Sequence, residues 1–169
     1  MPKSSIQPYW NICRRVYLVW AIIVFTGFIT THFYQRPEIN YLWLVLSAMG
    51  LGYMGLLLKQ MRFWQQKLLY IGLLWLLTIT FGLTISVIVF VYQPLGEMSA
   101  YLGIFWLLLM GLAHILNHVV DPSQVYLQSG GIQILTGTIC FIFEPLLSIQ
   151  YLAAGLVGAL AMVWLILFR

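Results

Sequence analysis

Three polar side chains that could bind a ligand lie close together in the second half of the sequence. Asn117 and His118 follow His114 by three and four residues, so a helix would carry all three side chains on one face. Two imidazoles at this spacing can hold a metal ion, and histidines on facing helices hold haem. Metal sites usually need about three or four ligands, and a third is missing here. We therefore expect these side chains to bind no metal and no cofactor. We expect them instead to form hydrogen bonds to water, lipid headgroups or Asp121.

Three of the four acidic residues lie near a proline in the short turns expected between apolar segments. If the turns meet on one face, the carboxylates of Glu38, Glu97 and Glu144 would form a ring that attracts cations or senses protons. The interpretation we favour is that each is a solvated charge at the tip of a loop. Glu144 merits a test as part of a candidate polar site, because apolar residues flank it on both sides.

The composition places the chain in the membrane class. It is 62% hydrophobic and 7% charged, whereas soluble domains are about 25% charged. Six apolar segments each approach the ~20 residues that a bilayer crossing requires, and unpaired backbone groups are not tolerated in hydrocarbon. The sequence therefore predicts an all-α polytopic membrane protein with six transmembrane helices in one integral membrane domain, residues 1–169. The expected helices are 16–34, 41–58, 68–92, 99–119, 129–143 and 149–168.

Positive charges indicate how these helices are oriented. Seven of the eight Lys and Arg residues fall on one side of a six-crossing path, and such an excess marks the cytoplasmic face. We expect a bacterial inner (plasma) membrane protein with both termini in the cytoplasm. These cations attract lipid headgroups, and the net charge of +4 does not indicate nucleic acid. The first apolar run lacks a small-x-small cleavage site, so we expect it to remain as a helix. The seven cations are Lys3, Arg14, Arg15, Lys59, Arg62, Lys67 and Arg169, with Arg36 opposite.

The order helix, proline turn, helix occurs three times and predicts three antiparallel helical hairpins. Small residues four apart let helices approach closely, either within the chain or between chains of an oligomer. Gly130, Gly131 and Gly137 indicate that the fifth and sixth helices pack as a pair. The other candidate packing residues are Ala48, Gly52, Ala154, Gly155, Gly158 and Ala159.

One segment resembles a known family. The order Ser129-Gly130-Gly131, then Gly137, Pro145, Gly155 and Gly158 is similar to a repeat unit of the HdeD-like acid-resistance membrane proteins. The resemblance covers mainly residues 129–168. It implies a small inner-membrane protein of three glycine-punctuated hairpins with a stress-related role, and it implies no catalytic residues.

Enzyme motifs such as HExxH, CxxC, GxSxG and the P-loop do not occur in the sequence. We therefore expect a non-enzymatic multi-pass protein that acts through association, as a stress-related, assembly or accessory factor. Its partners would be membrane lipids and a homo-oligomer or larger membrane complex. One alternative is a small transporter or channel, or the substrate-binding subunit of a larger transporter. Another is a haem- or quinone-binding subunit that uses His114 and His118. A transport path would use Glu144 and four third-helix hydroxyls, Thr78, Thr80, Thr84 and Ser86.

Overall fold

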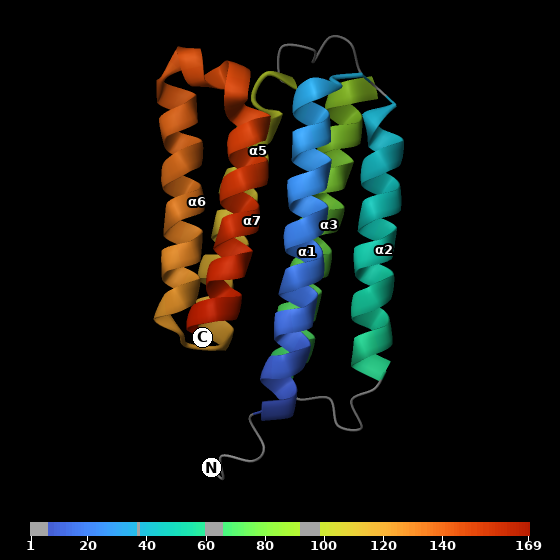
Figure 1. The fold of residues 1–169 in the computed structure, drawn as a ribbon, viewed down its shortest axis with the longest axis vertical. Helices are drawn as coiled ribbons and strands as arrows, with labels where there is room; N and C mark the ends of the chain where they lie inside the picture. Colours follow the sequence, from blue (N-terminus) through green and yellow to red (C-terminus); the bar gives the residue numbers. More distant parts are fainter. Residues whose placement is uncertain (1–6, 37, 60–65, 92–98) are drawn as a thin grey trace.

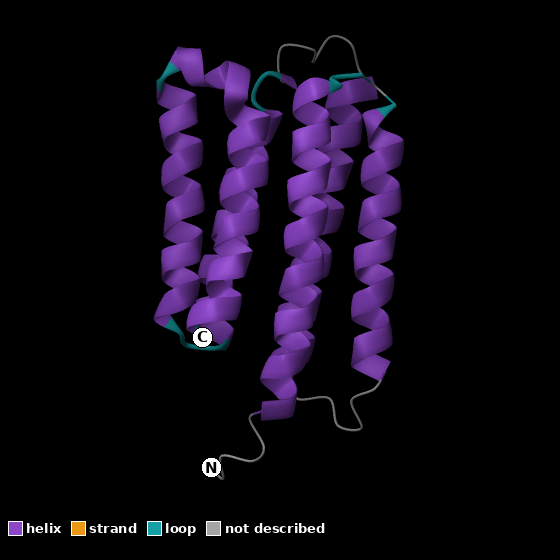
Figure 2. Cartoon of the chain, in the orientation of Figure 1, coloured by secondary structure: helices purple, strands orange, loops and turns teal. Residues whose placement is uncertain are grey.

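The computed structural model describes residues 7–36, 38–59, 66–91 and 99–169. These residues form a bundle of long helices, with no strand among them (Figures 1 and 2). Six of the helices are long and apolar enough to cross a bilayer, which confirms the predicted all-α polytopic membrane fold. The elements are α1 (Gln7–Phe33), α2 (Ile39–Lys59), α3 (Gln66–Val91), α5 (Leu102–Val120), α6 (Gln124–Ile142), the short 3-10 helix η3 (Glu144–Ile149) and α7 (Gln150–Phe168).

Four helices begin before their apolar segments, α2 and α3 by two residues and α1 and α6 by more. α1 starts at Gln7 rather than at residue 16, and α6 starts at Gln124 rather than at 129. Arg and Gln are good helix formers, so a helix continues through polar residues beyond the hydrocarbon boundary that hydropathy detects. α5 ends at Val120, just before Pro122, as expected because a proline disfavours helical backbone in the residue before it.

The helices follow one another up and down, so α1–α2, α3–α5 and α6–α7 are antiparallel neighbours (Figure 1). The most extensive contacts nevertheless join different hairpins, namely α1 with α7 and α5 with α6. α2 lies at one edge of the bundle and contacts α3 only slightly. We call the end where α1 begins and α7 ends the basal end, and the opposite end the apical end.

Glycines let α5 and α6 approach closely. A Cβ atom added at Gly130 would lie 2.6 Å from the carbonyl oxygen of Gly111, and one at Gly111 would lie 2.9 Å from that of Gly130. Gly137 also faces α5, whereas a Cβ at Gly131 would meet no atom within 4 Å. α6 and α7 do pack against each other, as the sequence predicts, but Gly130 and Gly137 face α5 rather than α7. Spacing shows which residues share a face, but it does not show which helix that face contacts.

The small residues of α7 are buried against α1. Ala154, Gly155, Gly158 and Ala159 are all buried, and a Cβ at Gly158 would come within 2.9 Å of the Val24 side chain. The other predicted pair of small residues, Ala48 and Gly52 of α2, is not buried.

Ala48 and Gly52 lie on the exposed face of α2, and a Cβ at Gly52 would meet nothing within 4 Å. Packing of this pair against another helix of the same chain is thus a wrong prediction. Gly50, two residues away and so on the opposite face, packs against Trp20 and Ile23 of α1 instead.

Aromatic side chains fill the centre of the bundle. The Trp43 and Trp106 rings are stacked with centroids 6.2 Å apart, and the Phe28 ring meets Trp43 edge-on at 4.7 Å. Each indole N–H is satisfied: Trp43 donates to Thr31 Oγ1 at 3.0 Å and Trp106 to Ser86 Oγ at 2.9 Å. An unpaired indole N–H would be costly in this apolar interior, so the two hydroxyls fix the rings in place.

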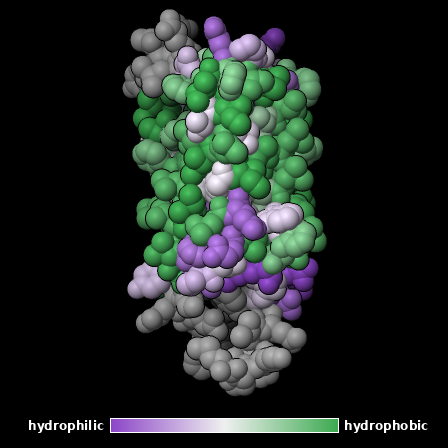
Figure 3. All heavy atoms as spheres, turned by 90° about the vertical axis from the view of Figure 1, so that its left-hand side faces the viewer, coloured by the Kyte–Doolittle hydropathy of each residue, from purple (hydrophilic) through white to green (hydrophobic). Residues whose placement is uncertain are grey.

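The outer surface matches a bilayer environment. On the face at the α6 side, hydrophobic residues cover the middle and hydrophilic residues gather toward the two ends (Figure 3). Many large apolar side chains of the bundle are exposed, including Leu135 at 61% and Leu160 at 63%. A contiguous apolar surface of this extent is expected where lipid chains replace water as the solvent.

Candidate functional site

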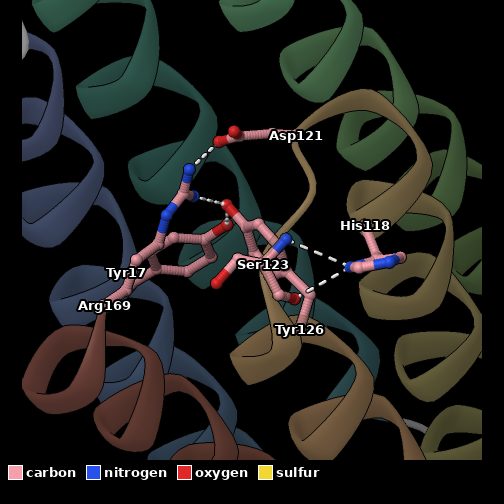
Figure 4. Close-up of polar contacts among 6 residues, drawn as sticks. All are labelled: Tyr17, His118, Asp121, Ser123, Tyr126 and Arg169. Atoms are coloured by element: carbon pink, nitrogen blue, oxygen red, sulfur yellow. Dashed lines mark hydrogen bonds and ion pairs between the residues drawn. The ribbon is translucent and has the colours of Figure 1, made fainter.

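A polar network closes the basal end of the bundle (Figure 4). Arg169 forms an ion pair with Asp121, in the turn between α5 and α6, and donates a hydrogen bond to the hydroxyl of Tyr126 on α6. The Tyr17 hydroxyl of α1 donates to the Tyr126 hydroxyl at 3.2 Å. The side chains of Arg169 and Asp121 are only 15% and 13% exposed. The network therefore joins α1, α6 and the end of α7 through partly buried groups.

Aromatic rings complete the environment of the Arg169 charge. Its guanidinium carbon lies 4.8 Å from the ring centroids of both Trp10 and Tyr126. Cation–π attraction of this kind is worth more when the groups are withdrawn from water. The sequence identified Arg169 only as a marker of orientation; its partner Asp121 is 48 residues away, too far for a local pattern to reveal.

His118 stabilises the turn between α5 and α6. Its Nδ1 lies 2.9 Å from the Ser123 carbonyl oxygen and 3.1 Å from the Ser123 backbone N–H, so it donates to the first or accepts from the second according to its tautomer (Figure 4). The Ser123 side chain makes no capping hydrogen bond at the start of α6, and the His118 imidazole bonds to the backbone there instead. This contact involves Nδ1, one of the two ring nitrogens of His118.

His114 and Asn117 lie inside the bundle, both 0% exposed. Neither the ring nitrogens of His114 nor the amide atoms of Asn117 have a hydrogen-bond partner among the described residues. The His114 ring lies against the edge of Trp75, with centroids 5.0 Å apart, and 6.4 Å from the ring of Tyr17. The predicted shared face is thus divided: two members are buried in the core, whereas His118 turns to the helix end.

Glu144 lies at the opposite, apical end. It is exposed in the first turn of η3, and the neighbouring Phe141 and Phe143 are also exposed, so they do not enclose the carboxylate. The structure therefore does not bring Glu144 together with the histidines. Glu38 is likewise exposed, while Glu97 lies outside the described residues, as does Pro37.

Gln150 organises the apical end and escaped the sequence-based prediction. Its side-chain oxygen accepts hydrogen bonds from the backbone N–H of Gly103 at 2.8 Å and of Ile104 at 3.3 Å, and its amide donates to Ala100 O. The N–H groups of Gly103 and Ile104 are among the backbone amides that every helix leaves unpaired in its first turn, here at the start of α5. The available signal was a glutamine at the start of an otherwise apolar helix. Its partners were not predictable, because they are up to 50 residues away.

In the described parts of the chain, no three His, Cys, Asp or Glu side chains are grouped so that they could hold a metal ion. No protein-family model, curated protein or solved structure matches the chain.

The third-helix hydroxyls do not line a path. Thr78, Thr84 and Ser86 each donate to the carbonyl oxygen four residues earlier, at 2.8 Å. Thr80 and Thr84 are exposed, while Thr78 and Ser86 are buried on the other side of α3. Since the hydroxyls bond within their own helix and face different sides, this arrangement gives no support to the transport alternative.

Proposed function

We propose that this is a non-enzymatic multi-pass membrane protein that acts through association, with a second copy of itself or within a larger membrane complex, as an assembly, accessory or stress-related factor. The observation that carries the proposal is the exposed small-residue face of α2, formed by Ala48 and Gly52. The resemblance of residues 129–168 to the HdeD-like proteins is in keeping with the stress-related role.

α2 is attached to the bundle on one side only. Of the residues in its apolar span, 17% are buried, compared with 50% for α5. It packs against α1 through Gly50, and its contact with α3 is slight. The face that carries Ala48 and Gly52 is thus open to the bilayer.

Helix association in lipid depends on close packing, because apolar burial gives little driving force there. An exposed glycine four residues from an alanine is a position where a second helix could approach closely and gain dispersion contacts. The polar networks around Arg169 and Gln150 join parts of the chain to one another. They support a role that requires a stable helical surface rather than a reacting group.

We expect Gly52→Leu to weaken association by about tenfold or more, which corresponds to ~1.4 kcal/mol, because the leucine holds a partner helix away. The measurement is energy transfer between labelled copies in liposomes, together with the set of proteins that copurify in mild detergent. Gly131→Leu is the matched control, since a Cβ at either glycine meets no atom within 4 Å.

Parent protein that is monomeric and purifies without partners would refute the association function. Equal association of Gly52→Leu and the parent would remove the α2 face from the interface.

The cation distribution supports a bacterial inner-membrane protein with both ends of the chain in the cytoplasm. A reporter that is active only in the cytoplasm, fused after Arg169, is expected to be active, and one that is active only outside is expected to be silent. The opposite pattern would contradict this orientation.

A further inference from the structure

Two buried methionines line a small cavity in the centre of the bundle. Met110 comes from α5 and Met162 from α7, and each side chain is 2% exposed. The free volume of the cavity is about 20 Å³, which holds one water molecule or one metal ion, whereas pockets for organic ligands measure roughly 300 Å³ or more. Four indole rings also line it, those of Trp20, Trp43, Trp75 and Trp106.

The thioethers of the two methionines face the same space. A Cβ atom added at Gly158 of α7 would lie 3.1 Å from Cε and 3.8 Å from Sδ of Met110, so the Met110 side chain reaches across to α7. Met162 follows Gly158 by four residues and therefore shares its face of the helix. Because helical side chains lean toward the preceding turn, Met162 extends toward Gly158 and hence toward Met110.

His114 lies beside this pair at the same depth in the bundle. It follows Met110 by four residues, so both side chains share one face of α5. α5 and α7 begin side by side, where the Gln150 side chain accepts the N–H of Gly103. His114 and Met162 are each twelve residues beyond the first residue of their helix, and both therefore lie about 18 Å from the apical end.

The imidazole of His114 is available as a ligand. Its side chain is 0% exposed, and neither ring nitrogen has a hydrogen-bond partner among the described residues. The Trp75 ring, which lines the cavity, lies 5.0 Å from the His114 ring. A buried polar group without a partner is costly, and a metal ion at the cavity would satisfy one of the two nitrogens.

We propose that Met110, Met162 and His114 bind a soft monovalent metal cation of the Cu⁺ and Ag⁺ type. Thioether sulfur selects Cu⁺, while Mg²⁺ and Ca²⁺ need oxygen ligands. The three ligands are neutral, so the bound ion keeps its positive charge. Indole is the aromatic group that attracts cations most strongly, and the attraction is greater away from water. The thioethers thus supply the ligands that the two histidines of α5 lack.

This metal site is independent of the proposed association face. It lies inside one copy of the chain, between α5 and α7, whereas Ala48 and Gly52 lie on the exposed face of α2. Metal binding and association are consequently separate properties, and each can fail without the other.

A silver titration tests the proposal, because Ag⁺ has the preferences of Cu⁺ and is not oxidised in air. Cys13 and Cys140 are first replaced by alanine, since both are free thiols that would bind the ion themselves. The protein is titrated in excess potassium nitrate, and tryptophan fluorescence is followed. We expect a saturable change at one Ag⁺ per chain. Absence of binding once the thiols are removed, or displacement of Ag⁺ by potassium, would overturn the proposal.

Three substitutions identify the ligands. Met110→Leu, Met162→Leu and His114→Leu should each weaken Ag⁺ binding by about tenfold or more, since the loss of even an outer partner of a metal site costs this much. Leucine conserves the volume of methionine, so the two methionine variants keep the packing of the core. Met49→Leu is the matched control, because Met49 is 64% exposed on α2.

Equal affinity of the parent and all three variants would refute the site. X-ray absorption of the Cu⁺-loaded, cysteine-free protein tests the same ligands without any change to them. Sulfur and nitrogen are expected as the nearest neighbours of copper, and a spectrum with oxygen neighbours alone would exclude the thioethers and the imidazole.

Discussion

Gly130→Ala is expected to destabilise the bundle by about 2–3 kcal/mol, although it adds a single methyl group. The new Cβ would lie 2.6 Å from the carbonyl oxygen of Gly111 and 2.7 Å from the Ile115 side chain. The carbonyl belongs to the backbone of α5, so no rotamer change can relieve the clash. α5 and α6 would have to separate along one of the two most extensive helix contacts of the bundle.

Gly131→Ala is the control for this substitution. The residue is adjacent in the same helix, is exposed, and has no atom within 4 Å of a built Cβ. There the change should be neutral or stabilising by up to ~1 kcal/mol, because alanine is the better helix former. Unfolding in a mixed-micelle denaturant titration, monitored by tryptophan fluorescence, gives both values. Equal stabilities of the two variants would show that α5 and α6 are not held at this distance.

The sequence predicted the architecture well because the bilayer restricts it so strongly. Length and apolar composition require helices that span the membrane, and unpaired backbone groups leave no other option for these segments. The boundaries were less accurate at Gln7 and Gln124, where the helices continue through polar residues. Hydropathy detects the hydrocarbon region, and helix formation does not stop at its edge.

Neighbour relations were the part that the sequence could not supply. In water, an apolar stripe identifies the face that turns to the core, but in lipid the outer face is equally apolar. Gly130 and Gly52 both have small-residue neighbours at helical spacing, yet one is buried against α5 and the other is exposed. Only the packed bundle distinguishes them.

Among the polar residues, too, the sequence identified some residues but not the groups with which others form hydrogen bonds. His114 and Asn117 were singled out because their spacing places them on one helical face, and both are fully buried. The bond of His118 to Ser123 depends on the geometry of one turn. The partners of Gln150 and Arg169 lie 43 to 50 residues away, at distances along the chain that no local spacing encodes.

Asp121→Asn is expected to destabilise the protein by about 2–4 kcal/mol, because it leaves the Arg169 charge partly buried without its counter-ion. The two side chains are 13% and 15% exposed, so solvent screens this pair less than it screens a surface pair. Arg169→Gln should be comparably harmful, since it also removes the bond to Tyr126 and the contact with Trp10. The measurement is again the free energy of unfolding in mixed micelles.

A double-mutant cycle isolates the ion pair from these other losses. With both Asp121→Asn and Arg169→Gln present, neither charge remains, and the double variant should be more stable than the sum of the single losses predicts by about 1–3 kcal/mol. Arg36→Gln is the matched control: this arginine is exposed and lies over the Tyr34 ring at 5.3 Å, so its loss should cost no more than ~0.5 kcal/mol. Strict additivity of the two basal substitutions would mean that Arg169 and Asp121 do not stabilise each other. The basal end would then be held by its other contacts, such as those of α1 with α7 and the hydrogen bond between Tyr17 and Tyr126.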